Sequence, residues 1–292
     1  MSAAVTRFRA AALQMRSGMR PQDNARTFEA LVREAAARGA AYVQSPEMTG
    51  GLVRDRAMLR ETVRPQERDI IAAAAARLSA ELRIHIHVGS TAIALDGGKL
   101  ANRALLFGPD GGLIASYDKI HMFDVDLDKG ESWRESATYQ PGARTVVAEL
   151  PFAKLGLSVC YDLRFPQLFK AQAMAGAQVL TVPAAFTRQT GEAHWHVLLR
   201  ARAIENGAWL VAAAQGGLHE DGRETFGHSM IVDPWGRIVA EAEHDEPGVI
   251  VADVDIAASA EARAKIPNLK NAREFTVDIA ASSVRPMRGA AS

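Results

Sequence analysis

The chain has 292 residues, 48% of them hydrophobic, and its 34 basic and 34 acidic side chains give a formal net charge of zero. This charge balance is not typical of a nucleic-acid or anionic-membrane partner, and no run of about 20 apolar residues suggests a transmembrane helix. A single cysteine excludes an internal disulfide, and the N-terminus lacks the apolar stretch of a signal peptide. We therefore expect a cytoplasmic protein that binds neither nucleic acid nor membrane.

Apolar runs alternate with helical patterns along the whole chain. The patterns predict helices over residues 24–38, 70–82, 165–176 and 191–205. They predict strands over residues 8–15, 41–44, 84–94, 103–107, 113–117, 155–159, 178–182, 209–214, around 231, and 249–254. This alternation indicates the α/β class. No Ser/Gly-rich linker divides it, so we expect one domain over residues 1–280 and a flexible tail over 281–292.

A short motif occurs twice. Pro109-Asp-Gly-Gly-Leu-Ile-Ala115 and Pro234-Trp-Gly-Arg-Ile-Val-Ala240 share the spacing Pro-x-Gly-x-apolar-apolar-Ala. Each copy predicts a tight turn before a strand, although turns of this kind are common in unrelated places. If the repeat reflects the architecture, the fold has two similar halves, each a sheet with helices on one face.

The only cysteine, Cys160, follows the apolar alternation of residues 155–159 and precedes a predicted helix. It therefore lies on the turn between a strand and its crossover helix. A free cysteine is most often a buried, inert hydrophobic side chain. In open α/β sheets, however, ligands bind at the carboxyl ends of the strands, so this position also suits a nucleophile.

Two further strand ends carry groups that complement a thiol. Glu47 follows the predicted strand 41–44, and Lys119 follows the strand 113–117. A thiol needs a base to become a nucleophile, and a carboxylate whose pKa is raised in a dry cleft can serve. A lysine ammonium can stabilise an oxyanion. Most Glu and Lys side chains are solvated, so the hypothesis depends on three complementary groups sharing this position.

These residues and their neighbours resemble the nitrilase, or carbon–nitrogen hydrolase, superfamily. The matching segments are Ser45-Pro-Glu47, Tyr117-Asp-Lys-Ile-His-Met-Phe-Asp124, Arg134-Glu135-Ser136 with Pro141-Gly142, and Val159-Cys-Tyr-Asp-Leu-Arg-Phe-Pro166. The resemblance covers the chain from residue 10 to about residue 275. It implies a four-layer αββα sandwich made of two pseudo-symmetric halves.

The resemblance also assigns roles to individual residues. It implies that Cys160 is the nucleophile, Glu47 the general base and Lys119 the proton donor that stabilises the oxyanion. Glu135 matches a second family glutamate that orients this triad, and the backbone N–H of Tyr161 would complete the oxyanion hole. The family requires no cofactor for this chemistry, and we expect no metal.

Within the superfamily, the chain is most similar to the amidases that hydrolyse deaminated glutathione, through segments 193–205, 212–216 and 226–236. This implies a thiol-dependent amidase that releases ammonia from a small carboxylate-bearing amide through a thioester on Cys160. ω-Amidase, N-carbamoyl-amino-acid amidohydrolase and aliphatic nitrilase activities stay open as alternatives. One departure is Gln44-Ser45 before Pro46, where relatives more often carry apolar residues next to the base.

Three side chains are candidates for substrate binding in addition to Tyr161. Arg164, in what we predict to be the first turn of a helix, could pair bidentately with a substrate carboxylate, with packing or an internal ion pair as the alternative. Phe186 and Thr187, which we place at the end of the next strand, are candidates to line the pocket. Ordinary core packing is the alternative for Phe186.

Two other classes of protein have weaker support. His85 and His87 share a strand face at a spacing that suits metal ligands, which would allow a metal-dependent hydrolase. No acidic or histidine cluster accompanies them, so we favour ordinary sheet histidines. His194 and His196 are two residues apart and do not share a helix face, which argues against a metal pair there. A non-catalytic binding module is the remaining class.

The segment 265–273 resembles the C-terminal part of the family, which in relatives crosses to a partner subunit. This resemblance predicts a homodimer or an assembly of dimers.

Overall fold

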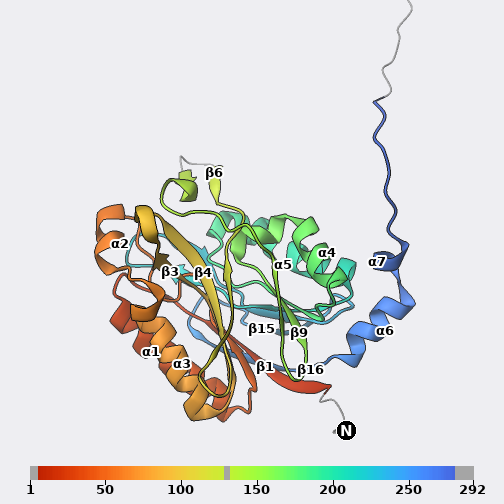
Figure 1. Ribbon diagram of the computed structural model, residues 1–292, viewed down its shortest axis with the longest axis horizontal. Coiled ribbons are helices and arrows are strands. Elements are labelled where there is room, and N and C mark those ends of the chain that lie inside the picture. The colour runs from red at the N-terminus through yellow and green to blue at the C-terminus, as the bar shows by residue number, and fades with distance from the viewer. Residues whose placement is uncertain (1–5, 128–131, 280–292) are drawn as a thin grey trace, which may run out of the picture.

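Two six-stranded mixed sheets stacked face to face form the centre of the computed structural model, which describes residues 6–127 and 132–279 (Figure 1). The first sheet has the order β16-β1-β2-β3-β4-β5. Its strands are β1 (Arg7–Gln14), β2 (Tyr42–Gln44), β3 (His85–Ala94), β4 (Leu100–Phe107), β5 (Leu113–Asp118) and β16 (Gly248–Asp255). The second sheet has the order β15-β14-β11-β10-β9-β8. Its strands are β8 (Val146–Glu149), β9 (Lys154–Leu157), β10 (Val179–Thr181), β11 (Trp209–Ala212), β14 (Met230–Val232) and β15 (Ile238–Glu241).

The two sheets have the same topology, strand for strand. In the first sheet, β16/β1 is antiparallel, β1/β2 and β2/β3 are parallel, and β3/β4 and β4/β5 are antiparallel. In the second sheet, β8/β9, β9/β10, β10/β11, β11/β14 and β14/β15 follow the same sequence of directions. The prediction of two pseudo-symmetric halves is confirmed.

The repeated Pro-x-Gly motif occupies equivalent turns, one between β4 and β5 and the other between β14 and β15. Gly111 and Gly236 both have a φ of +82°, a left-handed conformation that favours glycine. Each turn is closed by a matching backbone hydrogen bond, from Gly108 N to Gly112 O at 2.8 Å and from Asp233 N to Arg237 O at 2.9 Å. The motif is therefore a trace of the internal symmetry.

Helices cover the outer face of each sheet. The covering helices are α1 (Pro21–Ala37) and α3 (Ile70–Leu82) on the first sheet and α4 (Pro166–Met174) and α5 (Arg188–Asn206) on the second. Successive side chains of a strand point to opposite faces, and β1 shows the result. Ala10 and Ala12 join the core between the sheets, whereas Ala11 and Leu13 pack under α1 and α3. The four layers confirm the predicted αββα sandwich.

Every helix and strand predicted from the sequence forms, with ends that differ by a few residues. The placement of Phe186 and Thr187 at a strand end was wrong: β10 ends at Thr181, and Thr187 caps the N-terminus of α5, where its side chain accepts a hydrogen bond from Thr190 N. Arg164 likewise lies in a 3-10 helix, Cys160–Arg164, before α4 begins. A proline in the first turn has no N–H that needs a partner, and a threonine side chain before the helix accepts a hydrogen bond from a first-turn N–H. Both residues therefore decide where a helix begins.

Several short elements carry no strong pattern and were not predicted. They are α2 (Arg56–Thr62), β6 (Asp124–Asp126), β7 (Ser132–Arg134), β8, β12 (Gly216–Leu218), β13 (Glu224–Phe226), α6 (Ala257–Lys265) and α7 (Asn268–Asn271), with 3-10 turns at Gln66–Arg68, Asp96–Gly98 and Glu135–Ala137. Three-residue strands are too short to show an alternation of polar and apolar residues. Within the described ranges, no helix is long and apolar enough to cross a membrane.

The C-terminal segment leaves the body of the protein after α7 and extends away from the sheets (Figure 1). Phe275, Val277 and Ile279 are 85%, 79% and 92% exposed. The tail predicted over residues 281–292 lies outside the described residues.

Candidate active site

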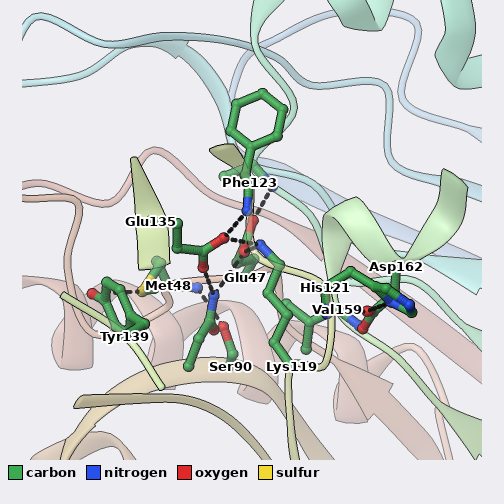
Figure 2. A network of polar contacts seen from close by, with 12 residues as sticks. Glu47, Met48, Ser90, Lys119, His121, Phe123, Glu135, Tyr139, Val159 and Asp162 are labelled. Carbon is green, nitrogen blue, oxygen red and sulfur yellow. Dashed lines mark hydrogen bonds and ion pairs between the residues drawn. The ribbon is translucent and has the colours of Figure 1, made fainter. Parts of the chain in front are cut away.

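The three strand ends singled out in the sequence meet at one place. Glu47 follows β2 and Lys119 follows β5 in the first sheet, and Cys160 follows β9 in the second. Lys119 Nζ lies 2.9 Å from Glu47 Oε1 and 2.9 Å from Glu135 Oε2. Figure 2 shows both carboxylates converging on the lysine. All four predicted side chains therefore form one buried cluster, with Lys119 only 2% exposed.

Asn102 on β4 joins this cluster and was not predicted. Its side-chain amide donates to Glu47 Oε1 at 2.9 Å and to Glu135 Oε1 at 3.0 Å. Its carbonyl accepts a hydrogen bond from Lys119 N at 3.0 Å. One asparagine therefore fixes the spacing of both carboxylates and the backbone of the lysine between them. Because β4 pairs with β5, this contact follows from the sheet register.

The backbone around Glu47 is held by contacts that cross between the sheets. Ala185 N donates to Glu47 Oε2 at 3.0 Å, and Gln215 Nε2 donates to Glu47 O at 2.9 Å. Gly89 of β3 lies tightly between this loop and the segment that follows β10. A Cβ there would lie 2.0 Å from Ser45 O and 2.3 Å from the Pro183 side chain, so only glycine fits.

The polar pair Gln44-Ser45, which departs from the family pattern, serves this same loop. Gln44 Nε2 crosses to Val211 O of the second sheet at 3.2 Å. Ser45 Oγ accepts a hydrogen bond from Gly89 N at 3.2 Å and lies 2.7 Å from Thr49 Oγ1. Both side chains thus help to hold the loop that carries Glu47. None of these hydrogen bonds goes to the Glu47 carboxylate.

Cys160 has a φ of +52°, in the left-handed region that residues with a Cβ seldom occupy. Its backbone N–H donates to Pro183 O at 2.8 Å. Non-glycine residues in this conformation cost of order 1–3 kcal/mol each and gather at functional sites. The sharp turn directs the thiol of Cys160 into the space above the strand ends.

Asp162 anchors this turn and was also missed by sequence reasoning. Its carboxylate is fully buried and accepts hydrogen bonds from Val159 N at 2.9 Å and Tyr117 Oη at 2.7 Å. It also accepts one from His121 N at 3.1 Å and lies 2.7 Å from His121 Nδ1. Figure 2 shows Asp162 between Val159 and His121. The thiol-bearing turn is thereby tied to the segment that carries Lys119.

The charges of the cluster shift one another's pKa values. Burial, together with the negative charge of Glu47, raises the pKa of Cys160 well above its usual range. Burial opposes the charge of Lys119, but Glu135 and Glu47 raise the pKa of the ammonium well above its ordinary value. Burial also acts to raise the pKa of Glu47, yet the Lys119 charge and hydrogen bonds from Cys160, Lys119 and Asn102 lower it overall.

The direction for Glu47 corrects the expectation of a raised carboxylate pKa. That expectation considered burial alone, whereas the ammonium of Lys119 lies 2.9 Å from the carboxylate. The resting site is therefore a neutral thiol beside an ionised carboxylate and an ammonium.

A cavity of about 340 Å³ opens above the cluster. All the site residues predicted from the sequence line it: Glu47, Lys119, Glu135, Cys160, Tyr161, Arg164, Phe186 and Thr187. The cavity is thus a single space in which the thiol and the charged groups face the same occupant.

Among the described residues, five arginines line the cavity, against two acidic side chains, Glu47 and Glu135. The guanidinium groups of Arg54 and Arg223 lie over the Trp133 ring, 4.6 Å and 4.4 Å from its centroid. Arg223 Nε is buried and has no hydrogen-bond partner within the described part of the chain. Arg223 Nη2 lies 3.6 Å from the buried carboxylate of Asp221, so the guanidinium is partly balanced, and its unused Nε donor can bind an anionic ligand group.

Arg164 lies on another wall of the cavity. Its guanidinium lies 5.3 Å from the Phe186 centroid and 5.9 Å from the Tyr161 centroid, and its Nη1 is 3.2 Å from His194 Nδ1. It makes no ion pair with a carboxylate of the described residues. Phe186 combines both expected roles, since it lines the cavity and packs on Trp195 at 4.9 Å.

His85 and His87 do not form a metal site in the described structure. His87 Nδ1 lies 2.8 Å from Tyr42 Oη, and burial lowers the pKa of His87 to about 3. The His85 ring packs edge-on against Phe152 with centroids 5.1 Å apart. Both are sheet histidines of the core, so the alternative of a metal-dependent hydrolase built on them has no support in their geometry.

A cavity above the strand ends of two stacked sheets, floored by a thiol, a carboxylate and an ammonium, places the protein among the α/β hydrolytic enzymes. The sequence comparison narrows this class: residues 9–264 match the family described as carbon-nitrogen hydrolase, and the chain belongs to that family. It is a hydrolase that acts on carbon–nitrogen bonds other than peptide bonds.

Individual relatives agree with this assignment. The chain is 39% identical over 270 residues to a deaminated glutathione amidase of Synechocystis sp., covering 90% of this chain and 97% of the relative. It is 34% identical over 274 residues to omega-amidase NIT2 of Danio rerio, covering 92% and 96%. Among solved structures, the NitFhit protein of C. elegans superposes with a TM-score of 0.83 at 31% identity, covering 92% of this chain and 66% of that one.

Proposed function

We propose that the protein is a thiol-dependent amidase that hydrolyses a small carboxylate-bearing amide and releases ammonia. The observation that carries the proposal is the buried cluster of Glu47, Lys119, Glu135 and Cys160 at the floor of one cavity. The names of the relatives, deaminated glutathione amidase and omega-amidase, support the same substrate class. We further propose that it acts in the cytoplasm on a small molecule, with no nucleic-acid or membrane partner.

The first half-reaction forms a thioester. As Cys160 Sγ attacks the amide carbonyl carbon, Glu47 takes the thiol proton, because its lowered pKa keeps it ionised as the acceptor. Lys119 has three N–H donors, and Glu47 and Glu135 each occupy one. The third can stabilise the oxyanion, together with the N–H of Tyr161. The C–N bond then breaks, and the proton held by Glu47 leaves with ammonia.

The second half-reaction releases the acid. Water enters the site vacated by ammonia, and Glu47 removes a proton from it as the oxygen attacks the thioester carbon. The second tetrahedral intermediate uses the same oxyanion donors. Its C–S bond breaks, the carboxylic acid leaves, and the proton returns from Glu47 to Cys160. Glu135 acts throughout as a positioning residue, because its carboxylate holds the Lys119 ammonium at 2.9 Å.

The arginine-lined wall supports the carboxylate requirement. Arg223 and Arg54 bracket Trp133 on one wall, and Arg164 lies over the rings of another. We propose that Arg223, with its unused Nε donor, and Arg164 hold substrate carboxylate groups while the amide lies at Cys160. A doubly anionic amide would use both walls.

The direct test is ammonia release from a parallel substrate panel. Deaminated glutathione, α-ketoglutaramate, a carbamoyl amino acid and a short nitrile are compared with a neutral amide of similar length. We expect the carboxylate-bearing amides to give the highest kcat/KM. A preference for the carbamoyl compound or the nitrile would replace the proposal with those activities of the same family.

Cys160→Ala separates chemistry from binding. We expect turnover to fall roughly 10⁴-fold or more, because the covalent route is lost, while circular dichroism shows an unchanged fold. Cys160 is the only cysteine, so trapping of a thioester on the intact chain can be read directly by mass spectrometry. Unchanged turnover in this variant would overturn the mechanism, and turnover that fails after chelation would revive a metal-dependent hydrolase.

We propose that the active form is a homodimer or an assembly of dimers. The exposed apolar side chains of Phe275, Val277 and Ile279 on the extended segment support an arrangement in which this segment binds a second copy. Sedimentation velocity at micromolar concentration should show a dimer, and Phe275→Asp with Val277→Asp should weaken it. A strictly monomeric wild-type profile would contradict this.

A further inference from the structure

A second cluster of potential ligands lies outside the cavity described above. It consists of His196 on α5, His228 between β13 and β14, and Glu241 at the end of β15. One ligand atom from each residue lies within 4.8 Å of the other two. We propose that this cluster binds a divalent transition metal ion, with Zn²⁺ as the best match. The inference goes beyond the amidase function and does not depend on it.

The distances within the cluster suit a metal after a small adjustment. His196 Nε2 lies 2.7 Å from Glu241 Oε1, and His228 Nδ1 lies 3.0 Å from the same oxygen. In a tetrahedral zinc site with bonds of about 2.0–2.1 Å, neighbouring ligand atoms are separated by roughly 3.3 Å. Each contact between Glu241 Oε1 and a ring nitrogen would therefore have to lengthen by a few tenths of an ångström, while the two ring nitrogens already lie within 4.8 Å of each other.

His228 is held in place by its surroundings. It has a φ of +55°, and its carbonyl accepts a hydrogen bond from Trp195 Nε1 at 2.8 Å. Its ring stacks on Phe226 with centroids 4.2 Å apart and an interplanar angle of 19°. A ring that is already fixed loses little further freedom on binding, which favours a ligand role.

The other two ligands come from rigid elements. His196 lies within the long helix α5. Its ring packs edge to face with that of Phe226, with ring centroids 6.0 Å apart. Glu241 pairs with Met230 in the β14–β15 ladder, and the following Ala242 N donates to Ser229 O at 2.9 Å. Ligands from a helix, a loop and a strand thus converge from three directions, as a coordination site requires.

The donor set points to the class of metal. Two imidazoles and one carboxylate, with the fourth position open, form a set that zinc proteins use. Magnesium and calcium prefer all-oxygen sites and are not expected to compete. The three side chains are 36%, 25% and 15% exposed, so an ion can reach them from solvent.

The competing interpretation is a hydrogen-bonded cluster in which Glu241 alone accepts from both rings. That arrangement needs no ion and would explain the short distances equally well. The two interpretations differ in one measurable respect, which is binding of zinc by the folded protein.

The test uses the untagged full-length protein, stripped with a chelator and exchanged into metal-free buffer. Calorimetric titration with zinc chloride should show one saturable site per chain, and elemental analysis after desalting should retain one zinc. Cobalt(II) should give the visible absorption of a low-coordinate site and be displaced by zinc. Magnesium should not bind.

Glu241→Gln removes one ligand while keeping the side-chain shape, and His228→Gln removes another. Loss of an outer-shell partner costs roughly 10–100-fold in metal affinity, so loss of a ligand should cost at least tenfold. His244→Gln is the matched control, because His244 is an exposed histidine close by in sequence that lies outside the cluster.

Zinc should also raise the unfolding temperature of wild-type protein and of His244→Gln, but not that of Glu241→Gln. If His228→Gln does not fold, Glu241→Gln alone still decides the outcome. Zinc binding that is equal in wild type and Glu241→Gln, or absent from wild type, would overturn the proposal and leave the hydrogen-bonded cluster.

Discussion

The charged side chains at the floor of the cavity and those on its arginine-bearing wall are paired differently. At the floor, Lys119 is balanced by Glu47 and Glu135 at 2.9 Å each. On the wall, Arg223 and Arg54 stack on Trp133, and Arg223 Nε has no hydrogen-bond partner within the described residues. The proposed function assigns proton transfer to the floor, where each charge has a partner at 2.9 Å, and anion binding to the wall, where Arg223 has only a longer ion pair of 3.6 Å with Asp221.

This difference separates two kinds of effect on catalysis. Changes at the floor should lower kcat, because the proposed mechanism has these groups act on the reacting atoms. Changes on the wall should raise KM for carboxylate substrates and leave kcat for neutral amides nearly unchanged.

The largest effect short of removing the thiol is expected for Glu47→Gln. The substitution keeps the side-chain shape but removes the proton acceptor, so kcat should fall about 10²- to 10⁴-fold. Glu47 also raises the pKa of Cys160, so that pKa should fall in the variant. Iodoacetamide labelling of Cys160, followed against pH by mass spectrometry, should then show a midpoint at lower pH than in wild type.

In Glu47→Gln, kcat should fall while labelling of Cys160 becomes possible at lower pH. Loss of the base can therefore be distinguished from a general loss of structure. A general loss of structure would lower turnover and shift labelling erratically, whereas loss of the base lowers turnover and makes the thiolate easier to form. A variant that keeps wild-type kcat would show that Glu47 is not the base.

Lys119→Met should combine a catalytic loss with a loss of stability. One oxyanion-hole donor contributes roughly 10²- to 10³-fold in kcat. Removing the buried cation leaves Glu47 and Glu135 unpaired, which costs about 3–5 kcal/mol at neutral pH. Without Lys119, burial raises the pKa of Glu47 above its unfolded value, so the variant is most stable below the unfolded pKa and loses stability as pH rises.

Urea unfolding at two pH values measures how the stability difference between Lys119→Met and wild type changes with pH. The deficit of Lys119→Met relative to wild type should shrink between pH 7 and pH 5, provided both unfold in two states. A deficit that is independent of pH would show that the carboxylates stay unprotonated or find other partners.

The central residues could be predicted from the sequence because each follows a strand with a clear apolar pattern. Cys160, Glu47 and Lys119 occupy strand ends that the sandwich brings together, and the repeated Pro-x-Gly turn correctly indicated two halves. The motif around Glu135 then added the second carboxylate.

The residues that support them could not be found in this way. Asn102 and Asp162 act through contacts between segments, and no local pattern distinguishes them from ordinary polar residues. Arg223 belongs to the cavity only because the β12–β13 hairpin folds over it. The pKa of Glu47 was expected in the wrong direction for another reason: the expectation considered burial and left out the charge of Lys119, whose distance of 2.9 Å only the structure shows.

A smaller effect is expected on the wall. Arg223→Gln should lower kcat/KM for a carboxylate-bearing amide roughly 10- to 100-fold, which is the contribution of a hydrogen bond to a charged group. The loss should come from KM. The neutral amide is the internal control, because it has no carboxylate for the Arg223 guanidinium to bind. An equal loss for both substrates would assign Arg223 a structural role and remove the distinction between wall and floor.

The pH dependence of kcat/KM for the neutral amide gives the smallest and sharpest comparison. Because the pKa of Glu47 lies below the ordinary value of 4.5, wild-type activity should fall on the acid side only below that pH. The charge of Glu135 raises the pKa of Lys119 more than any other charge does, so Glu135→Gln should move the alkaline loss of activity to lower pH.

Arg223→Gln should leave both limbs of the pH profile unmoved, because its guanidinium is not part of the proposed proton-transfer cluster. Brief exposure to each pH, with return to pH 7 to verify recovery, separates titration from unfolding. If Glu135→Gln retained the wild-type alkaline limb, Glu135 would not hold the charge of Lys119, and the floor would depend on Glu47 alone.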